Sequence, residues 1–547
     1  MDRKAILINS VMGSLMASMT MSALVIALPA IFRGVGVDPL SPEGFTAMFW
    51  LILVYPFVVA ISVAIIGRIS DMWGKGRAFT VGAVLFTIAS LLLGIAPGKG
   101  SVALYQLIIY RVLQAIGGSL MFSNSAAIIA DVFPPSERGF AQGIIGISFG
   151  AGSILGLLIG GVLAVVDWRW VFLVNVPIGA INVLWAYRVV YNVSPGVGRV
   201  VVDVPGVAAL ASSLFLILLG LVFAMLPYGD SLVGWGNPLV WALIAAGLVL
   251  LAAIVPIERR AATPIFRLDL FKIRQFSFGV LSAFFLFMAQ GANIFVLSLL
   301  LQAIYLPLHG IPYEDTPFWA GVYLIPSSIA SAAFAPIGGK LLNKLGARVV
   351  ATVGAVLMAI GFELLAALPM SFSYALFAGI IFLIGMGSGL FMSPNLVSIL
   401  SSVPSNLRST ASGVRASLQN IGTLMSFAIF MTLIVIGSSA ALAPSIRSAL
   451  IGAGLTAQQA DELLAIPPAF ALFAAFLGYN PIATLAKMTG ASIQPAIYAK
   501  ITEPQFFASA IAPAMGLGFN YAYHLAAALA LMAALLSYFR GREIFIE

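Results

Sequence analysis

Cysteine is absent from this chain of 547 residues. Its absence excludes disulfides, thiolate metal sites and cysteine nucleophiles. Histidine occurs only twice, as His309 and His524, which is too few for a histidine metal cluster. The sequence also carries no Ser/His/Asp grouping that could act as a catalytic triad. We therefore expect no metal, no cofactor, no catalytic residues and no enzymatic activity.

Charge is also scarce. Charged residues make up 8% of the chain, whereas a soluble domain has about 25%. Hydrophobic residues make up 61%, and the mean hydropathy is +1.08. A membrane-spanning helix needs about 20 apolar residues, and we identify fourteen stretches of suitable length. The composition predicts an all-α polytopic membrane protein with fourteen transmembrane helices.

The few positive charges are unevenly distributed. With the N-terminus placed inside, the inner segments hold 20 Lys and Arg residues and the outer segments hold six. This bias predicts a multi-pass protein of the cell membrane with both termini in the cytoplasm. An even number of spans follows, so the short apolar run 469–476 is interpreted as a re-entrant or surface helix. The net charge of +8 is assigned to contact with the lipid bilayer and not with nucleic acid.

Two loops repeat one pattern about half a chain apart. The first carries Gly67, Asp71, Gly74 and Arg77, and the second carries Gly339, Asn343, Gly346 and Arg348. The segments 134–143 and 404–413 repeat with almost the same offset, 270 residues against 272. A shared offset indicates a duplicated membrane bundle, as in many secondary transporters.

The composition of these loops suits a gate between the bundles. Glycines let a tight connection pass close to neighbouring helices, and Asp71 can pair with Arg77 or accept hydrogen bonds from a helix N-terminus. Such a cluster can lock one bundle against the other in one access state. The alternative is an ordinary solvated inner loop.

The repeat divides the chain into three parts. Residues 1–195 form an N-terminal six-helix bundle, and residues 196–275 form two extra transmembrane helices and a cytoplasmic linker. Residues 276–547 form a C-terminal six-helix bundle with a long outer loop, 441–508. Within that loop, Thr456 and Gln459 have the spacing of a capping box that opens a short helix. Loops of this length are lids, partner surfaces or disordered segments, and the sequence leaves these alternatives open.

Arg111 is the most informative single residue. It lies about 14 Å below the outer end of its helix, near the middle of the bilayer. A guanidinium there costs at least ~2.5 kcal/mol, so it must face a partner or a wet cavity. Gln114 and Asn124 lie further along the same helix. We interpret this group as part of a substrate or proton pathway; the alternative is an arginine that caps backbone carbonyls between helices.

Further polar residues extend this candidate pathway. Glu363 is a carboxylate well inside an apolar span and is a candidate proton carrier, with Asp131 as a second candidate. The alternative for Glu363 is a side chain that reaches the outer headgroups. Gln290 and Asn293 are polar groups within a span of the second half.

Small residues mark the helix contacts. Gly117, Gly152, Gly156 and Gly160 are expected to let helices pack closely and slide. Ser18 and Ser22 belong to a hydroxyl stripe on the first helix. This stripe either lines the cavity or bonds to a neighbouring helix.

Several of these segments resemble the major facilitator superfamily, and specifically its 14-helix drug:proton antiporter branch (QacA/EmrB type). The resemblance rests on the loop motif, on Arg111-x-x-Gln114 followed by Gly117 and Gly118, and on the segment 167–179. It implies two six-helix bundles plus two extra central helices. It also implies export of hydrophobic small molecules by proton antiport with alternating access, as in multidrug efflux, without any need for an oligomer.

The sequence departs from that branch at two positions. Thr20 stands where the branch has an acidic residue, and Leu157 stands where it has a proline. Both changes bear on proton coupling and on a preference for cations. An importer or facilitator of a small organic anion is therefore a second hypothesis. A membrane sensor or lipid-acting protein is a remote third one.

Overall fold

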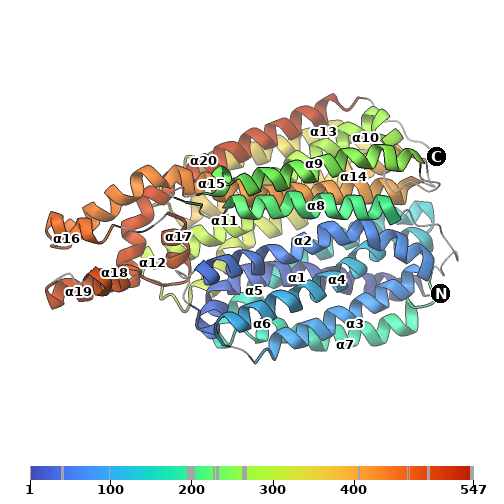
Figure 1. Ribbon diagram of the computed structural model, residues 1–547. Coiled ribbons are helices and arrows are strands. Elements are labelled where there is room, and N and C mark those ends of the chain that lie inside the picture. Colours follow the sequence, from blue (N-terminus) through green and yellow to red (C-terminus); the bar gives the residue numbers. More distant parts are fainter. Residues whose placement is uncertain are drawn as a thin grey trace.

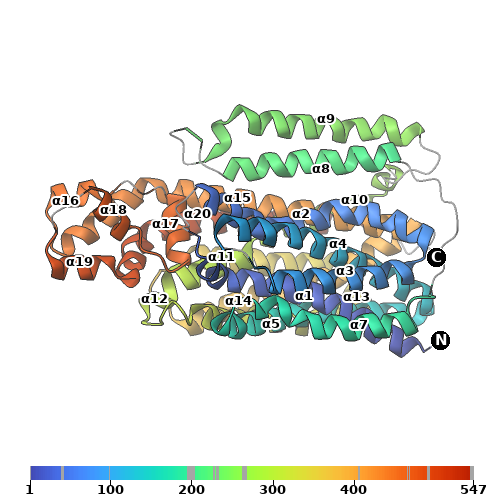
Figure 2. The same ribbon diagram turned by 60° about the horizontal axis from the view of Figure 1, so that its bottom comes forward.

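The computed structural model describes residues 2–37, 42–97, 99–193, 204–225, 228–229, 233–260, 268–404, 407–464, 466, 468–489 and 493–541. The helices run roughly parallel in one elongated bundle, and both ends of the chain lie at the same end of it (Figures 1 and 2). We call this the inner end and the opposite end the outer end.

The N-half comprises the first seven helices. They are α1 (Arg3–Val35), α2 (Pro42–Trp73), α3 (Lys75–Gly94), α4 (Gly100–Val132), α5 (Pro135–Val166), α6 (Trp170–Leu173) and α7 (Asn175–Val189). Local sequence sets the ends of α1, since the Asp2 carboxylate caps its first turn and Gly36, at φ 71°, ends it. Inside this half α1 packs on α5, α3 packs on α4, and α2 packs on α4.

The C-half repeats this architecture with more irregular helices. It contains α10 (Arg274–Gln290), α11 (Asn293–Leu300), the π-helix η3 (Leu301–Tyr305), α12 (Leu306–Leu308), α13 (Thr316–Ala366), α14 (Tyr374–Ser401), α15 (Arg408–Gly452) and α20 (Pro504–Phe539). Helix α13 is two spans, 316–342 and 344–366, that meet at a turn containing Gly346.

Two extra helices lie along one side of the junction between the halves. Helices α8 (Val204–Met225) and α9 (Pro238–Arg260) form an antiparallel pair, joined by a loop with the short helix η1 (Gly234–Gly236). Figure 2 shows this pair set apart from the remaining helices. Helix α8 contacts α2 of the N-half and α15 of the C-half. The short helix η2 (Leu268–Lys272) precedes α10, and residues 194–203 and 261–267 lie outside the described part.

The outer segment was expected to be a long loop, and this expectation was wrong. Helix α15 continues to Gly452, and α16 (Ala457–Glu462), α17 (Pro468–Phe476), α18 (Ile482–Thr489) and α19 (Pro495–Thr502) follow it. At 1.5 Å per residue the 45 residues of α15 span about 65 Å, roughly twice the hydrocarbon core. The extended ends of α15 and α20 therefore carry this segment outward, as Figure 1 shows.

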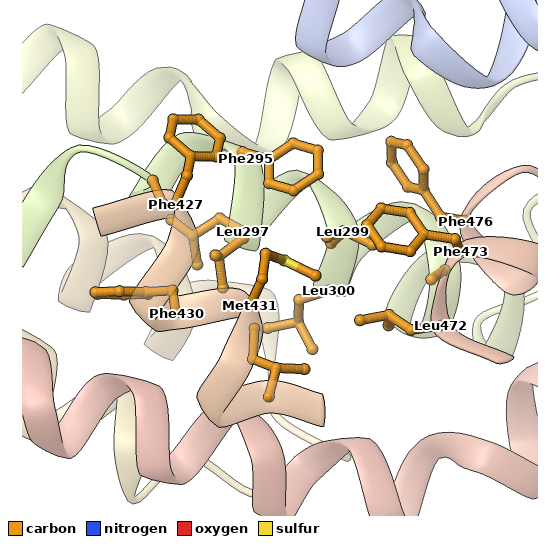
Figure 3. Close-up of a cluster of buried hydrophobic side chains, with 14 of the residues drawn as sticks. Phe295, Leu297, Leu299, Leu300, Phe427, Phe430, Met431, Leu472, Phe473 and Phe476 are labelled. Carbon is orange, nitrogen blue, oxygen red and sulfur yellow. The ribbon is translucent and has the colours of Figure 1, made fainter. Parts of the chain in front are cut away.

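Two predictions about this segment are confirmed. Thr456 and Gln459 form the capping box at the start of α16. Helix α17 has nine residues and is too short to span a bilayer. Its Phe473 and Phe476 are fully buried against Phe295 of α11, and Phe427 of α15 completes this cluster (Figure 3). Helix α17 is therefore inserted into the outer side of the C-half.

The number of spans agrees with the expected architecture. In the described part of the chain, twelve helices are long and apolar enough to cross a membrane. The described apolar stretches of α2 and α5, 46–62 and 151–166, are shorter but belong to helices of 32 residues each. The expected count of fourteen is reached when these two helices are included.

Candidate functional site

The first loop of the repeat packs against the inner end of its own half. Gly74 has a φ of 99°, which favours glycine, and Lys75 Nζ lies 2.8 Å from Asp131 Oδ2. The Arg77 guanidinium lies 5.6 Å from the centre of the Tyr191 ring. Asp131 is thus held in an ion pair at the inner end in this conformation. Gly67 and Asp71 lie in the last turns of α2, and the Asp71 side chain lies outside the described part.

The second loop has the same local geometry. Gly346 has a φ of 79°, and the Arg348 guanidinium lies 4.1 Å from the centre of the Tyr538 ring. Gly339 faces the side chain of Ser393 on α14. Each of these contacts lies within the C-half, just as those of the first loop lie within the N-half. The side chain of Asn343 lies outside the described part.

Arg111 is 1% exposed and sits among neutral groups inside the N-half. Its Nη1 donates to Gln114 Oε1 at 2.8 Å, and Gln114 Nε2 donates to Ser90 Oγ of α3 at 2.8 Å. The guanidinium lies 4.7 Å from the ring centre of Tyr55 on α2, a cation–π contact. Nε of Arg111 is buried without a hydrogen-bond partner. Arg111 thus contacts Gln114 of its own helix and Tyr55 of α2, and Gln114 connects this group to Ser90 of α3.

Two glycines make room for this cluster. A Cβ at Gly118 would collide with the Tyr55 hydroxyl, and a Cβ at Gly117 would lie 2.6 Å from the backbone nitrogen of Phe86 on α3. The pair of glycines after Arg111 and Gln114 thus lets α2 and α3 approach α4. Asn124 lies further along α4 and donates to the backbone oxygen of Leu120 at 2.8 Å.

The hydroxyl stripe on α1 faces α5. Ser22 Oγ lies 3.0 Å from Ser153 Oγ, and Ser18 is 2% exposed. Gly152, Gly156 and Gly160 line the opposing face, where added Cβ atoms would meet the backbone of α1. For Ser18 and Ser22 the structure thus favours bonding to a neighbouring helix over lining a cavity.

The two positions that depart from the antiporter pattern have ordinary contacts. Thr20 Oγ1 donates to Asn175 Oδ1 on α7 at 3.3 Å, so a hydrogen bond occupies the place of the acidic group. Leu157 is fully buried at the outer end of α5. A Cβ at Gly321 of α13 would lie 2.5 Å from the Leu157 backbone oxygen.

Gln290 and Asn293 flank a break between α10 and α11. Helix α10 ends at Gln290, and α11 begins at Asn293. The backbone nitrogen of Ala292, within the break, donates to Ser426 Oγ of α15 at 3.0 Å. Asn293 is 6% exposed, and its Oδ1 is buried without a hydrogen-bond partner. The break thus places an unsatisfied acceptor within the C-half.

Glu363 has a partner that the sequence did not indicate. Its Oε1 lies 3.0 Å from His524 Nδ1 of α20, and more than half of each side chain is exposed. The pair joins the second span of α13 to α20 within the C-half.

The halves meet tightly at the outer end. Gly161 of α5 faces the backbone of Pro317 and Phe318, and Gly321 faces the backbone of Leu157. We call this contact between α5 and α13 the outer seam. Small residues permit such close backbone approach, and the seam joins the two halves on this side.

A pocket of about 290 Å³ lies just beyond the outer seam. Its charged lining residues are Arg33 of α1, Asp167 and Arg169 of the segment before α6, and Glu314 of the loop before α13. Trp168, 4% exposed, also lines it. The sequence did not predict this pocket, because its walls come from segments far apart in the chain. The charged residues and tryptophans of the segment 167–170 were the one feature of the sequence that could have indicated it. No group of three or more potential metal ligands occurs within the described residues.

Comparisons with known proteins agree with this architecture. The family model of the Major Facilitator Superfamily matches residues 11–427. The chain belongs to the major facilitator superfamily. The expected membership is confirmed, and its relatives are consistent with the drug antiporter branch.

Superfamily relatives align over most of this chain. Multidrug resistance protein 3 of Bacillus subtilis is 28% identical over 78% of this chain and 79% of that protein. A puromycin resistance protein of Streptomyces alboniger is 30% identical over 76% and 79%. A riboflavin transporter of Clostridioides difficile is 28% identical over 78% and 87%.

Solved structures of the superfamily share the fold. A bacterial homologue of the human lysosomal transporter Spinster matches with a TM-score of 0.54 at 18% identity, over 98% of this chain and 97% of that one. The xylose transporter XylE of E. coli matches with a TM-score of 0.51 at 16% identity, over 78% and 89%. At these identities the likeness concerns the fold alone.

Proposed function

We propose that this superfamily member exports hydrophobic small molecules across the cell membrane by alternating access. The observation that carries the proposal is the glycine-lined outer seam between two repeated halves. Contacts of this kind hold few interlocking side chains, so the halves can separate and close again without repacking a core. The relatives named for multidrug and puromycin resistance support a hydrophobic organic substrate.

Proton exchange is the proposed source of energy. Glu363 and His524 are the candidate carrier pair, because their side chains contact each other at 3.0 Å, are more than half exposed and lie in two neighbouring spans of the C-half. Asp131 is the second candidate, and its use would require release from Lys75. Uptake of a proton by Asp131 would break its ion pair with Lys75, and uptake by Glu363 would change its contact with His524, so either step could favour a change of conformation.

Arg111 is proposed to organise the substrate pathway of the N-half. All its described partners are neutral, and its Nε has no hydrogen-bond partner. A buried cation in this state gains most from an anionic group. This observation favours a second candidate function, the transport of a small organic anion.

The proposal is tested by efflux from proteoliposomes. A neutral lipophilic fluorescent dye and a fluorescent organic anion such as carboxyfluorescein are loaded, and their release is followed with and without a pH gradient. We expect gradient-driven release of the lipophilic dye, loss of that release in Arg111→Ala, and normal release in Lys500→Gln, which removes an exposed charge on α19. Release of the anion alone would favour the second function, and release no faster than from protein-free vesicles would refute both.

The role of Glu363 and His524 is tested by the response of transport to a pH gradient. Glu363→Gln is expected to abolish acceleration by the pH gradient and to leave exchange without a gradient within about twofold of the unmodified protein. Asp131→Asn is the matched comparison. A Glu363→Gln variant that still responds to the gradient would exclude Glu363 as the carrier and leave Asp131.

A further inference from the structure

The pocket beyond the outer seam has opposite charges on its two sides. Arg33, Asp167 and Arg169 come from the N-half and together carry one net positive charge. Glu314 is the one lining residue that comes from the C-half within the described chain, and it carries a negative charge. The two halves therefore present complementary charges where they meet at the outer surface.

Arg33 and Glu314 are opposite charges on the two sides of this junction. Both residues line the pocket, and both side chains are exposed. Arg33 lies in the last turn of α1, whose position relative to α5 is fixed by the glycine contacts described above. Glu314 lies two residues before α13, the helix that forms the C-half side of the outer seam. Movement of α13 away from α5 thus carries Glu314 away from Arg33.

The segment 167–169 holds the end of α1 in place. The Trp168 indole covers Gly34, where a Cβ would collide with the ring. Arg169 lies 4.5 Å from the centre of that ring, and its backbone nitrogen donates to Asp167 Oδ1 at 2.9 Å. These contacts attach α1 to the start of α6 directly beside Arg33. The family-like segment therefore has a positioning role at the outer surface.

We propose that Arg33 and Glu314 form an outer charge gate, positioned by Trp168, which favours closure of the outer seam. The inference rests on the alternating-access function proposed above. Exposed charge pairs contribute little to stability, so the gate biases the closed state and does not lock it. A stronger pair would hinder opening in each transport cycle. Because both charges are exposed, salt screens their attraction.

Accessibility of a single thiol tests the gate. The chain has no cysteine, so Ile325→Cys supplies the sole thiol, on α13 one helical turn inward of Gly321, the residue that faces Leu157 across the outer seam. A membrane-impermeant maleimide added outside intact cells labels this thiol when the seam opens. Glu314→Gln and Arg33→Gln are each expected to raise the labelling rate about two- to fivefold. Raising the ionic strength is expected to remove most of the difference.

Two further variants separate a gate from a general structural effect. The charge swap Arg33→Glu with Glu314→Arg is expected to restore slow labelling. Arg447→Gln, which removes an exposed outer charge far from the seam, is expected to leave the rate unchanged. Unchanged labelling rates in both single variants would overturn the gate. A double variant that is labelled as fast as the single variants would overturn it as well. Labelling requires no substrate, so this outcome is independent of whether efflux is observed.

Discussion

Gly74 and Gly346, 272 residues apart, adopt the same uncommon backbone conformation. Their φ and ψ angles are 99° and 131° in Gly74 and 79° and 156° in Gly346. Both end the first helix of a helix pair at the inner end of a half. Residues with a side chain rarely adopt this conformation, so the duplicated sequence pattern reflects a duplicated turn.

The arginine that follows each glycine repeats its contact as well. Arg77 lies over Tyr191, two residues beyond the end of α7, and Arg348 lies over Tyr538 in the last turn of α20. In both halves the loop cation thus contacts a tyrosine near the C-terminal end of the last helix of the same half. The turn at the other repeated segment also recurs, since the backbone nitrogens of Glu137 and Leu407 each donate to a proline oxygen at 2.9 Å.

The two glycine turns are expected to be intolerant of a side chain. Gly74→Ala and Gly346→Ala should each destabilise the protein by about 1–3 kcal/mol, because alanine is strained at these angles. Gly379→Ala is the control, since this glycine is helical with open space around it, and it should be neutral or stabilising. Thermal unfolding in detergent measures the three variants. Equal melting temperatures in all three would contradict the assignment of strain.

The Tyr55 ring, and not its hydroxyl, is expected to support Arg111. The hydroxyl is buried without a hydrogen-bond partner, whereas the ring faces the guanidinium. Tyr55→Phe should therefore retain transport within about twofold, and Tyr55→Ala should lose most of it, since a cation–π contact of about 1–2 kcal/mol disappears along with its packing. Dye efflux from proteoliposomes compares the two. Severe loss in Tyr55→Phe would instead assign the role to the hydroxyl.

Helix α17 is expected to depend on its buried phenylalanines. Phe473 is fully buried and lies 6.4 Å, between ring centres, from Phe295 (Figure 3). Phe473→Ala should cost about 3–5 kcal/mol through lost burial and a cavity. Phe382→Ala, at a ring 39% exposed, should cost far less. Denaturation monitored by protease cleavage within the outer segment would show the difference, and similar resistance in both variants would argue against insertion of α17.

The Arg447–Asp461 pair is expected to hold α16 against α15 in a pH-dependent way. Arg447 Nε lies 2.6 Å from Asp461 Oδ1, and this hydrogen bond lowers the pKa of the Asp461 carboxyl below its usual value. A lowered pKa means that the contribution is present above the ordinary aspartate pKa and is lost as pH falls through the lowered one. Asp461→Asn should thus increase hydrogen exchange around residue 460 equally at pH 6 and pH 8. A difference between variant and unmodified protein that grew below pH 4 would contradict this sign.

The fold could be predicted because it depends on composition and on repeated local patterns. The apolar stretches define the spans, and the repeated loop indicates the two halves. The capping box at Thr456 was likewise visible, because its four residues are adjacent in the chain. The length of α15 could not be predicted from hydropathy. Its outer part is stabilised by packing against α20, a contact between segments far apart in the chain.

The sequence by itself determined that this is a polytopic helical protein with a duplicated bundle, a buried arginine and two unusual glycine turns. These features follow from composition, from the spacing of neighbouring residues and from a local pattern that occurs twice in the chain. Tertiary structure alone decided the partners: Tyr55 for Arg111, His524 for Glu363, and Glu314 across the outer seam from Arg33. The physical reason is that such pairings depend on which helix faces meet, and packing across the whole bundle sets this.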